Sequence, residues 1–172
     1  QHEVERAIHA AIERELGICY YATDCPGIGG RLRATEEDFI VEEIPAERKL
    51  SGGPYLVCRL TKRNWELQHA VKEIAKRLGI SHRRIGWAGT KDRNAVTSQW
   101  ISIYDILPDQ LATLHLKDIS IEPVGHSNEP LMLGDLLGNR FDITIREPDP
   151  SDLGERVQQI AGTVSEGVPN YF

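Results

Sequence analysis

The amino-acid sequence predicts an α+β fold in which helices flank a mixed, mostly antiparallel sheet. Of its 172 residues, 40% are apolar and 27% are charged, which is typical of a globular domain. Segments with strand-like patterns outnumber segments with helical periodicity. Too few helices fall between consecutive strands to supply the crossovers of a doubly wound parallel sheet.

The first expected elements are a helix and two strands. Residues 2–16 carry apolar side chains at helical spacing, and Gly17 follows at the position of a C-terminal stop. After a loop rich in Gly and Pro, the residue types predict short neighbouring strands at 30–34 and 39–44. Pro45 ends the second strand because proline has no N–H to donate to a ladder.

A strand, a helix and two further strands follow. Apolar and polar side chains partly alternate over residues 55–60, which predicts a strand. Residues 67–78 have helical periodicity and are followed by Gly79. A short apolar run at 85–88 and a stretch rich in β-branched and aromatic residues at 96–103 predict two strands joined by a loop.

The last expected elements are two strands and a helix. Residues 119–124 and 140–146 have strand-like composition. Ser151 is suited to cap a helix that carries apolar residues from 153 to 164.

The cysteines and histidines do not indicate a disulfide framework or a metal site. Cys19, Cys25 and Cys58 are odd in number and have neither CxxC spacing nor a nearby His pair, so we expect buried, reduced thiols. The six histidines are scattered along the chain without metal-ligand spacing. We therefore expect no metal.

Hydropathy excludes a membrane protein. The sequence contains no run of about 18 uncharged apolar residues and no basic-then-apolar leader, so we expect neither a membrane span nor a secretory signal. The predicted location is the cytoplasm. The chain begins at Gln1 rather than Met and ends with an aromatic stretch, which indicates a piece of a longer protein.

Charge is distributed unevenly along the chain. The formal net charge is −6, but residues 58–100 carry ten basic and three acidic side chains, whereas residues 1–57 and 101–172 are both acidic. A basic block of this kind is either an ordinary solvated surface or a surface that contacts phosphate. The residues within the block must decide between the two.

Asp92 is the residue of most chemical interest in this block. It lies between Lys91 and Arg93 in loop 89–95, and loops held by strands often carry catalytic side chains. An aspartate with a pKa of about 3.9 is ionised at pH 7, and neighbouring cations favour that form, so Asp92 suits a nucleophile or a base. A turn aspartate in a salt-bridged hairpin is the alternative. The loop lacks Walker and GxGxxG spacing, so no nucleotide cofactor is expected.

Four segments resemble motifs of one enzyme family. They are RATEEDFIVEE at residues 33–43, IGWAGTKDRNAVTSQ at 85–99, GNRF at 138–141 and GVPNYF at 167–172. Together they resemble the signature of the TruD family of tRNA pseudouridine synthases, with a layout closer to archaeal members. The resemblance implies that residues 1–172 form part of the catalytic domain, without the rest of that domain or the inserted second domain.

The resemblance implies a role for individual residues. Asp92 falls on the family's catalytic aspartate, which attacks the target uridine or removes a ribose proton, so that the base detaches, turns and rejoins the sugar through carbon. Arg33 falls on the basic residue that pairs with this aspartate, and Asn139 on the amide that helps to position it. Phe141 matches the aromatic side chain that stacks on the target base. Phe39 matches a further aromatic side chain near the pocket.

The implied substrate is a uridine in the D-arm region of tRNA, at position 13 in the family. The isomerisation consumes no water, redox equivalents or ATP, so no cofactor is expected. Extruding a base from RNA costs a few kcal/mol, and stacking on one aromatic ring can return about 1–3 kcal/mol. Lys91, Arg83 and Arg84 are expected to contact the RNA as part of the basic block.

Other interpretations remain open at this stage. A catalytically inactive RNA-binding module would keep the same fold, but a carboxylate at Asp92 would repel RNA phosphate without serving chemistry. An unrelated hydrolase with an Asp92 nucleophile lacks an identifiable acid partner. Arg33 is alternatively a surface ion pair, Asn139 a turn residue, and Phe39 and Phe141 core residues.

Overall fold

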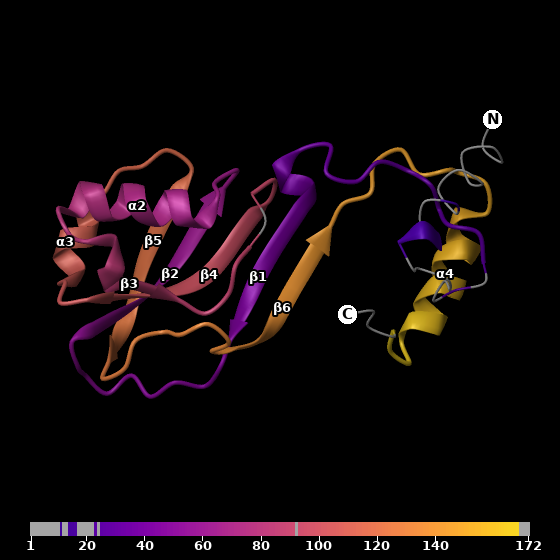
Figure 1. The fold of residues 1–172 in the computed structure, drawn as a ribbon. Helices are drawn as coiled ribbons and strands as arrows, with labels where there is room; N and C mark the ends of the chain where they lie inside the picture. Colours follow the sequence, from indigo (N-terminus) through magenta and orange to yellow (C-terminus); the bar gives the residue numbers. More distant parts are fainter. Residues whose placement is uncertain (1–10, 12–13, 17–22, 24, 92, 169–172) are drawn as a thin grey trace. The chain divides into compact units, whose positions relative to one another are not determined.

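The computed structural model describes residues 11, 14–16, 23, 25–91 and 93–168. The chain divides into two compact units, Arg31–Arg146 and the combination of Gln1–Gly30 with Glu147–Phe172. The predicted helix at 2–16 falls largely outside the described residues. All predicted site residues belong to the larger unit, which contains the sheet (Figure 1).

Six strands of the larger unit form one sheet among the described residues. Its order is β5-β2-β4-β1-β6, and β3 pairs with β4 beside this path. Only the β1·β4 pairing is parallel, which confirms the predicted mixed and mostly antiparallel sheet. The strands are β1 Phe39–Pro45, β2 Tyr55–Arg63, β3 Ile85–Trp87, β4 Val96–Tyr104, β5 Ile119–Ser127 and β6 Leu136–Ile143.

One edge of β4 is shared by two strands. Its first part, residues 96–98, pairs with β1 in parallel, and residues 101–103 pair with β3 in the antiparallel sense. The two partners therefore separate from β4 at Gln99 and Trp100. We call this place the fork.

Helix α2 (Leu67–Leu78) matches its predicted range. The Glu66 carboxylate accepts hydrogen bonds from the amides of Gln68 and His69, which lowers its pKa and satisfies two donors at the helix start. The helix ends at Gly79, which adopts φ of 67°. The sequence alone therefore encodes both ends of this element.

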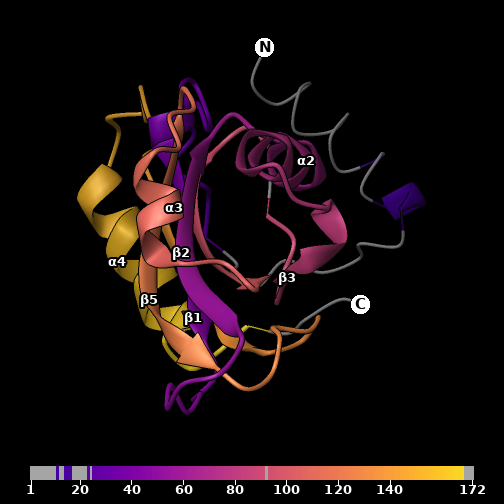
Figure 2. The same ribbon diagram turned by 90° about the vertical axis from the view of Figure 1, so that its left-hand side faces the viewer.

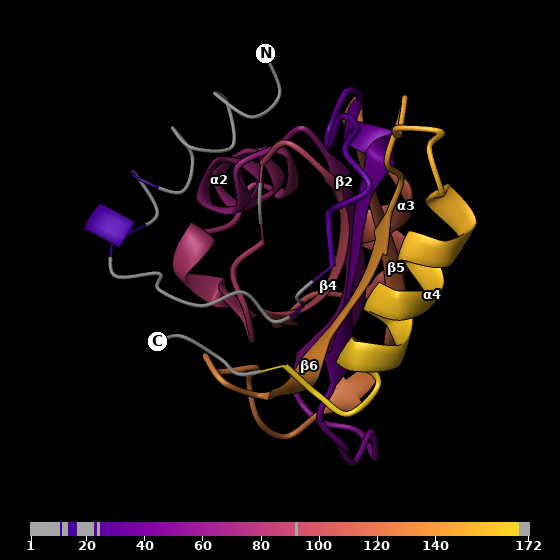
Figure 3. The same ribbon diagram turned by 90° about the vertical axis from the view of Figure 1, so that its right-hand side faces the viewer.

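Helix α2 covers one face of the sheet over β2 and β4 (Figures 2 and 3). The short helix α3 (Pro108–Ala112), which the sequence patterns did not predict, adds Leu111 to the same cluster. Burying each Leu, Ile or Val side chain contributes about 1.5–3 kcal/mol, so this cluster holds the unit together. Its buried residues are Leu56, Cys58, Leu60, Leu67, Val71, Ile74, Ala75, Ile85, Ile101, Ile103, Ile106 and Leu111.

The free thiols fit their predicted state only in part. Cys58 is buried, and burial raises the pKa of its thiol to about 12, so it is chemically inert at neutral pH. Cys25 is free and half-buried, and Cys19 lies outside the described residues.

The predicted strand at 30–34 is wrong. Only Arg31 makes a bridge, to Arg146, and Arg33 adopts φ of 53°, which interrupts an extended chain. The next residues form the 3-10 turn η1 (Glu36–Asp38), in which the Thr35 amide donates to the Asp38 carboxylate. A local side-chain hydrogen bond therefore competes successfully with strand pairing.

Other predicted boundaries also differ from the structure: β2 and β5 extend to Arg63 and Ser127, beyond the predicted 55–60 and 119–124. The strand expected at 140–146 is β6, and it ends at Ile143 because its partner β1 begins opposite, at Phe39. Helix α4 (Leu153–Val164) in the smaller unit has Asp152 rather than Ser151 at its N-cap. The Ser151 amide instead donates to the Asp149 carboxylate.

An ion pair joins the start of β1 to the chain that follows β6. Both carboxylate oxygens of Asp38 accept from the Arg146 guanidinium at 2.7 Å, and the Asp38 side chain is buried. The Arg146 hydrogen bond is the main cause that lowers the pKa of Asp38 from 3.8 to about 2. The contact also fixes the segment that carries Arg33, because Arg31 and Arg146 exchange backbone hydrogen bonds.

This ion pair predicts a defined pH dependence. Because the folded pKa of Asp38 is depressed, its stabilising contribution is present above about pH 4 and is lost as the pH falls toward about 2. Asp38→Asn should therefore destabilise the protein at pH 6, and the difference from wild type should shrink at pH 3. Urea denaturation at both pH values measures this. Asp142→Asn, at an exposed position of β6, should show little difference at either pH; a gap for Asp38→Asn that stays constant would contradict the assignment.

Candidate active site

The predicted site residues on β1 and β6 share one face of the sheet. Directly opposite residues of neighbouring strands point to the same side. Thr97 lies opposite both Lys62 and Val41, and Val41 lies opposite Phe141. Lys62 is two residues from Leu60, so this is the face that α2 covers over β2 and β4. We call it the site face; it also carries Phe39, Glu43, Gln99 and Asn139.

An aromatic and cationic group lies on the site face over β1 and β6. The Arg33 guanidinium carbon is 3.9 Å from the centre of the Phe39 ring, a cation–π contact. The Phe39 and Phe141 rings are 6.0 Å apart at an interplanar angle of 57°. Phe141 is 56% exposed, and Asn139, two residues earlier on β6, is exposed too. Exposed aromatic rings on an open sheet face can stack on a flat ligand.

The backbone at Arg33 is strained. Its φ of 53° lies in the left-handed region, which costs a residue other than Gly about 1–3 kcal/mol. The bridge from Arg31 to Arg146 and the turn at Thr35 hold the chain on either side. The surrounding structure thus fixes Arg33 where its side chain meets Phe39.

A buried ion pair fills the fork. The Lys91 ammonium donates to Glu43 Oε2 at 2.6 Å, and both side chains are almost completely buried. Glu43 Oε1 accepts from the Trp100 amide at 3.1 Å. That amide lies where β1 and β3 have both left β4, so the carboxylate replaces a missing strand partner.

A second contact anchors the start of loop 89–95. Gln99 Nε2 donates to the Gly89 carbonyl oxygen at 2.7 Å. A Cβ atom at Gly89 would lie 2.7 Å from both Glu43 Oε2 and Lys91 Nζ. Only glycine fits there without displacing the ion pair, which accounts for this residue type at the first position of the loop.

A family model described as tRNA pseudouridine synthase D (TruD) matches residues 15–172. The chain belongs to this family. A probable tRNA pseudouridine synthase D of Methanococcoides burtonii is 47% identical over 165 residues, which cover 94% of this chain and 38% of that protein. A probable tRNA pseudouridine synthase D of Thermococcus onnurineus is 47% identical over 154 residues, which cover 88% of this chain and 36% of that protein.

Solved structures give the same result for the fold. The crystal structure of the putative tRNA pseudouridine synthase D (TruD) from Methanosarcina mazei matches with a TM-score of 0.88 at 40% identity, over 94% of this chain and 38% of that one. The chain thus spans about 38% of the length of such TruD relatives. The resemblance noted from the four motifs is confirmed.

The structure brings four of the predicted TruD site residues together, namely Arg33, Phe39, Asn139 and Phe141, on adjoining segments of β1, β6 and the chain before β1. Asp92 lies outside the described residues. The loop that contains it leaves β3 at the fork and returns at Val96, which pairs with β1. The roles of all these residues stay predictions.

Arg83 and Arg84 lie elsewhere, in the 3-10 turn η2 (His82–Arg84) before β3. The Arg84 guanidinium donates to the carbonyl oxygens of Tyr104 and Asp105. With a rise of about 3.3 Å per residue, this end of β4 is about 23 Å from Thr97. Contact of the two arginines with RNA stays a prediction, and much of the hydrogen-bonding capacity of Arg84 is already used.

The basic block does not form one exposed surface. Lys62 and Lys91 are buried, so in this structure they do not face phosphate. Arg59 and Arg63 pair with carboxylates of β1 and η1. The exposed cations among the described residues of the block include Lys72, Lys76 and Arg83.

The sequence analysis did not identify the buried polar residues of the site face. Glu43, Thr97 and Gln99 are buried on the site face beside the buried ammonium of Lys62. Thr97 Oγ1 and Gln99 Oε1 are buried without a hydrogen-bond partner within the part of the chain that the structure describes. The alternation of inward and outward side chains along a strand does not distinguish such residues from core residues. Charged and amide side chains at inward positions are unusual in a core, and this signal could have identified them.

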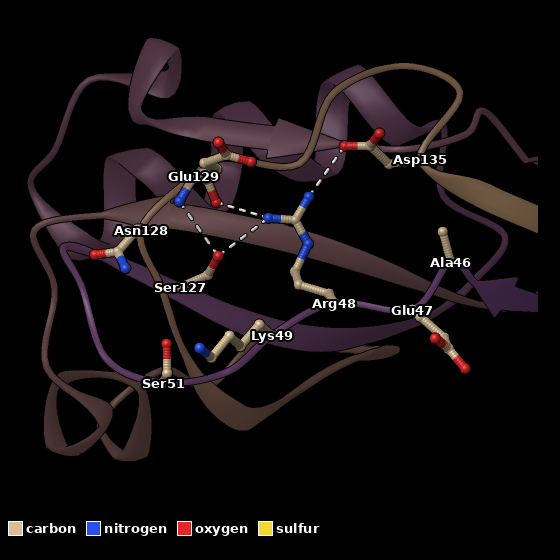
Figure 4. Close-up of a pocket in the computed structure, with 9 residues that line it drawn as sticks. All are labelled: Ala46, Glu47, Arg48, Lys49, Ser51, Ser127, Asn128, Glu129 and Asp135. Carbon is tan, nitrogen blue, oxygen red and sulfur yellow. Dashed lines mark hydrogen bonds and ion pairs between the residues drawn. The ribbon is translucent and has the colours of Figure 1, made fainter.

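A surface pocket of about 440 Å³ is lined by residues other than the predicted site residues, and Figure 4 shows this lining. Arg48 crosses it and donates to Ser127 Oγ, to the Asp135 carboxylate and to two backbone carbonyl oxygens. The guanidinium therefore holds loop 128–135 in place through these hydrogen bonds. That loop in turn supports the residue before Gly89, because the Gly134 amide donates to the Ala88 carbonyl oxygen.

The described residues contain no group of three or more His, Cys, Asp or Glu side chains placed to hold a metal ion. None of the helices formed by these residues has the length and apolar character needed to cross a bilayer.

The unpartnered hydroxyl of Thr97 predicts an unusual stability effect. Replacing it with the isosteric Val removes a buried polar atom that lacks a hydrogen bond, so Thr97→Val should raise the free energy of unfolding by up to about 1–3 kcal/mol. Thr61→Val is the matched control, because its hydroxyl bonds Ser98 Oγ at 3.0 Å and its loss should be destabilising. Thermal melting compares the two variants. A lower melting temperature for Thr97→Val would mean that this hydroxyl has a partner outside the described residues.

Proposed function

We propose that the full-length protein containing this chain isomerises a uridine of tRNA to pseudouridine, with Asp92 as the catalytic carboxylate. The finer assignment, a uridine in the D-arm region at position 13, comes from the family resemblance. The observation that carries the proposal is the meeting of Arg33, Phe39, Asn139 and Phe141 on one open sheet face within a TruD-family fold.

The open face suits an extruded base. A uracil ring freed from the RNA stack needs an apolar surface, and Phe141 offers an exposed ring beside that of Phe39. Arg33 lies against Phe39, the other ring of this pair, and a guanidinium at this place suits pairing with a carboxylate. Asn139 supplies amide donors and acceptors on the same strand as Phe141.

The chemistry requires one carboxylate near the ribose of the extruded nucleotide. In the proposed reaction, Asp92 either attacks the sugar carbon and displaces N1, or removes a ribose proton as the bond from N1 to the sugar breaks. A bond from C5 to the sugar then forms, and Asp92 is displaced from the sugar in the first case or returns the proton to the ribose in the second. The base loses the C5 proton and gains one at N1, so no oxidant, reductant or water is consumed. Arg33 then pairs with Asp92, and Asn139 helps to orient it.

The first test concerns Asp92. Asp92→Asn should abolish pseudouridine formation, because an amide is neither a nucleophile nor a base, while tRNA affinity stays equal or rises slightly as a negative charge is removed. Pseudouridine is mapped in tRNA after incubation with each full-length protein, and Kd is measured in parallel. Wild-type activity in the variant would remove Asp92 from the mechanism. A wild-type protein that binds tRNA without modifying it would favour the inactive RNA-binding module.

The second test concerns Phe141. Because its side chain is 56% exposed, Phe141→Ala should change the melting temperature little. If the ring stacks on the base, its loss should lower the single-turnover rate about 5- to 160-fold, which corresponds to about 1–3 kcal/mol. Phe141→Tyr should keep most of the activity, since the ring remains. A large fall in melting temperature with an unchanged rate would assign Phe141 to packing alone.

A further inference from the structure

We propose that the buried Glu43–Lys91 ion pair positions the loop that carries Asp92, so that Lys91 acts through the backbone rather than by contacting RNA. The proposal rests on the proposed function, in which Asp92 is the catalytic carboxylate. Lys91 directly precedes Asp92, and its ammonium is held by Glu43 inside the fork. An anchor at Lys91 is one Cα–Cα step, about 3.8 Å, from the residue that follows it in the sequence.

The pair is held from more than one side. Glu43 is fixed through its backbone in β1, opposite Asn139 on β6, and through the hydrogen bond from the Trp100 amide to its carboxylate. Gln99 holds the first loop residue through the Gly89 carbonyl oxygen. The loop is therefore attached to β1 by a side chain and to β4 by a second one, and the strand that anchors Lys91 is paired directly with the strand that carries Asn139 and Phe141.

The free energy of folding alone does not explain why a buried ion pair joins Glu43 and Lys91. Removing two charges from water is costly, and a buried ion pair is often no more stabilising than apolar side chains of the same volume. What an ion pair adds is a fixed end point, because the buried ammonium of Lys91 must stay beside the Glu43 carboxylate that compensates its charge. A charged pair thus fixes the loop in one position where an apolar contact would permit several.

The glycine at the start of the loop supports this reading of the fork. A Cβ atom at Gly89 would come within 2.7 Å of both charged groups, Glu43 Oε2 and Lys91 Nζ. Gly89 does not have a positive φ, so its residue type is explained by this close approach rather than by backbone conformation. Gly89→Ala consequently displaces the pair without removing either charge.

The experiment compares two kinds of disturbance in the full-length protein. The double variant Glu43→Gln with Lys91→Met replaces the pair by neutral groups of similar volume, and its amide oxygen can still accept from Trp100. We expect it to fold with a melting temperature close to wild type, to bind tRNA with Kd within about twofold, and to lose about 10- to 100-fold in single-turnover rate at saturating protein, the size of effect that a misplaced catalytic group produces. Gly89→Ala should lower the same rate with unchanged Kd.

The neighbouring residue supplies the matched control. Glu42 lies on the opposite face of β1, and its carboxylate accepts from the Arg59 guanidinium at 2.7 Å. Glu42→Gln therefore removes an ion pair from the adjacent position of the same strand. Its single-turnover rate should equal that of wild type.

The outcomes separate this proposal from the proposed function. A wild-type rate per folded molecule in the double variant or in Gly89→Ala would overturn the positioning role, and if the double variant does not fold, Gly89→Ala decides. A higher Kd with a wild-type rate at saturating protein would show that Lys91 acts in RNA binding instead. Activity that survives in Asp92→Asn would refute the catalytic assignment itself, whatever the other variants do.

Discussion

One edge of β4 pairs with two different strands, β1 and β3, and this constraint explains the buried contacts around the fork. Because β1 is parallel to β4 and β3 is antiparallel to it, the two strands diverge at Gln99 and Trp100. The Trp100 amide is left without a strand partner, and an unpaired buried amide is costly. A side-chain acceptor is required, and Glu43 supplies it. That carboxylate then needs a cation, which Lys91 provides from the adjacent loop.

The site face has two parts, which meet where β4 changes its pairing partner. One part packs against α2, and the other carries the predicted site residues. Over β2 and the second half of β4, the face is covered by α2 and filled with aliphatic side chains. Over β1 and β6, in the described part of the chain, the face carries aromatic, amide and cationic side chains, and Phe141 is more than half exposed. A large exposed ring next to another ring is more informative than a scattered apolar residue, since isolated exposed apolar side chains are common in all proteins. Strand β4 pairs with β2 in the covered part and with β1 in the open part, and so connects the two.

Local patterns predicted the elements whose signals are local and failed where a distant partner decides. The range 67–78 of α2 follows from its apolar spacing, the residues at its start and Gly79. The strand at 30–34 failed because a hydrogen bond between Thr35 and Asp38 and the conformation of Arg33 outweigh residue propensity. The end of β6 was misplaced because it depends on where β1 begins.

The residues of the site also differ in how far the sequence predicted them. Motifs shared with the TruD family pointed to Arg33, Phe39, Asn139 and Phe141, which the fold brings to one face. No local pattern pointed to Glu43, because its partners lie 48 and 57 residues away and meet it only through the parallel pairing of β1 with β4.

The fork also changes the electrostatic interpretation of the loop. The sequence predicts that Lys91 and Arg93, as members of the basic block, both place positive charge beside Asp92. Glu43 neutralises Lys91 at 2.6 Å, and both side chains are buried, so at a distance the pair acts as a small dipole rather than as a positive charge. Of the two flanking cations, only the exposed Arg93 then contributes net charge to the loop surface. A count of charges along the sequence therefore cannot distinguish an exposed cation from one that is buried in an ion pair.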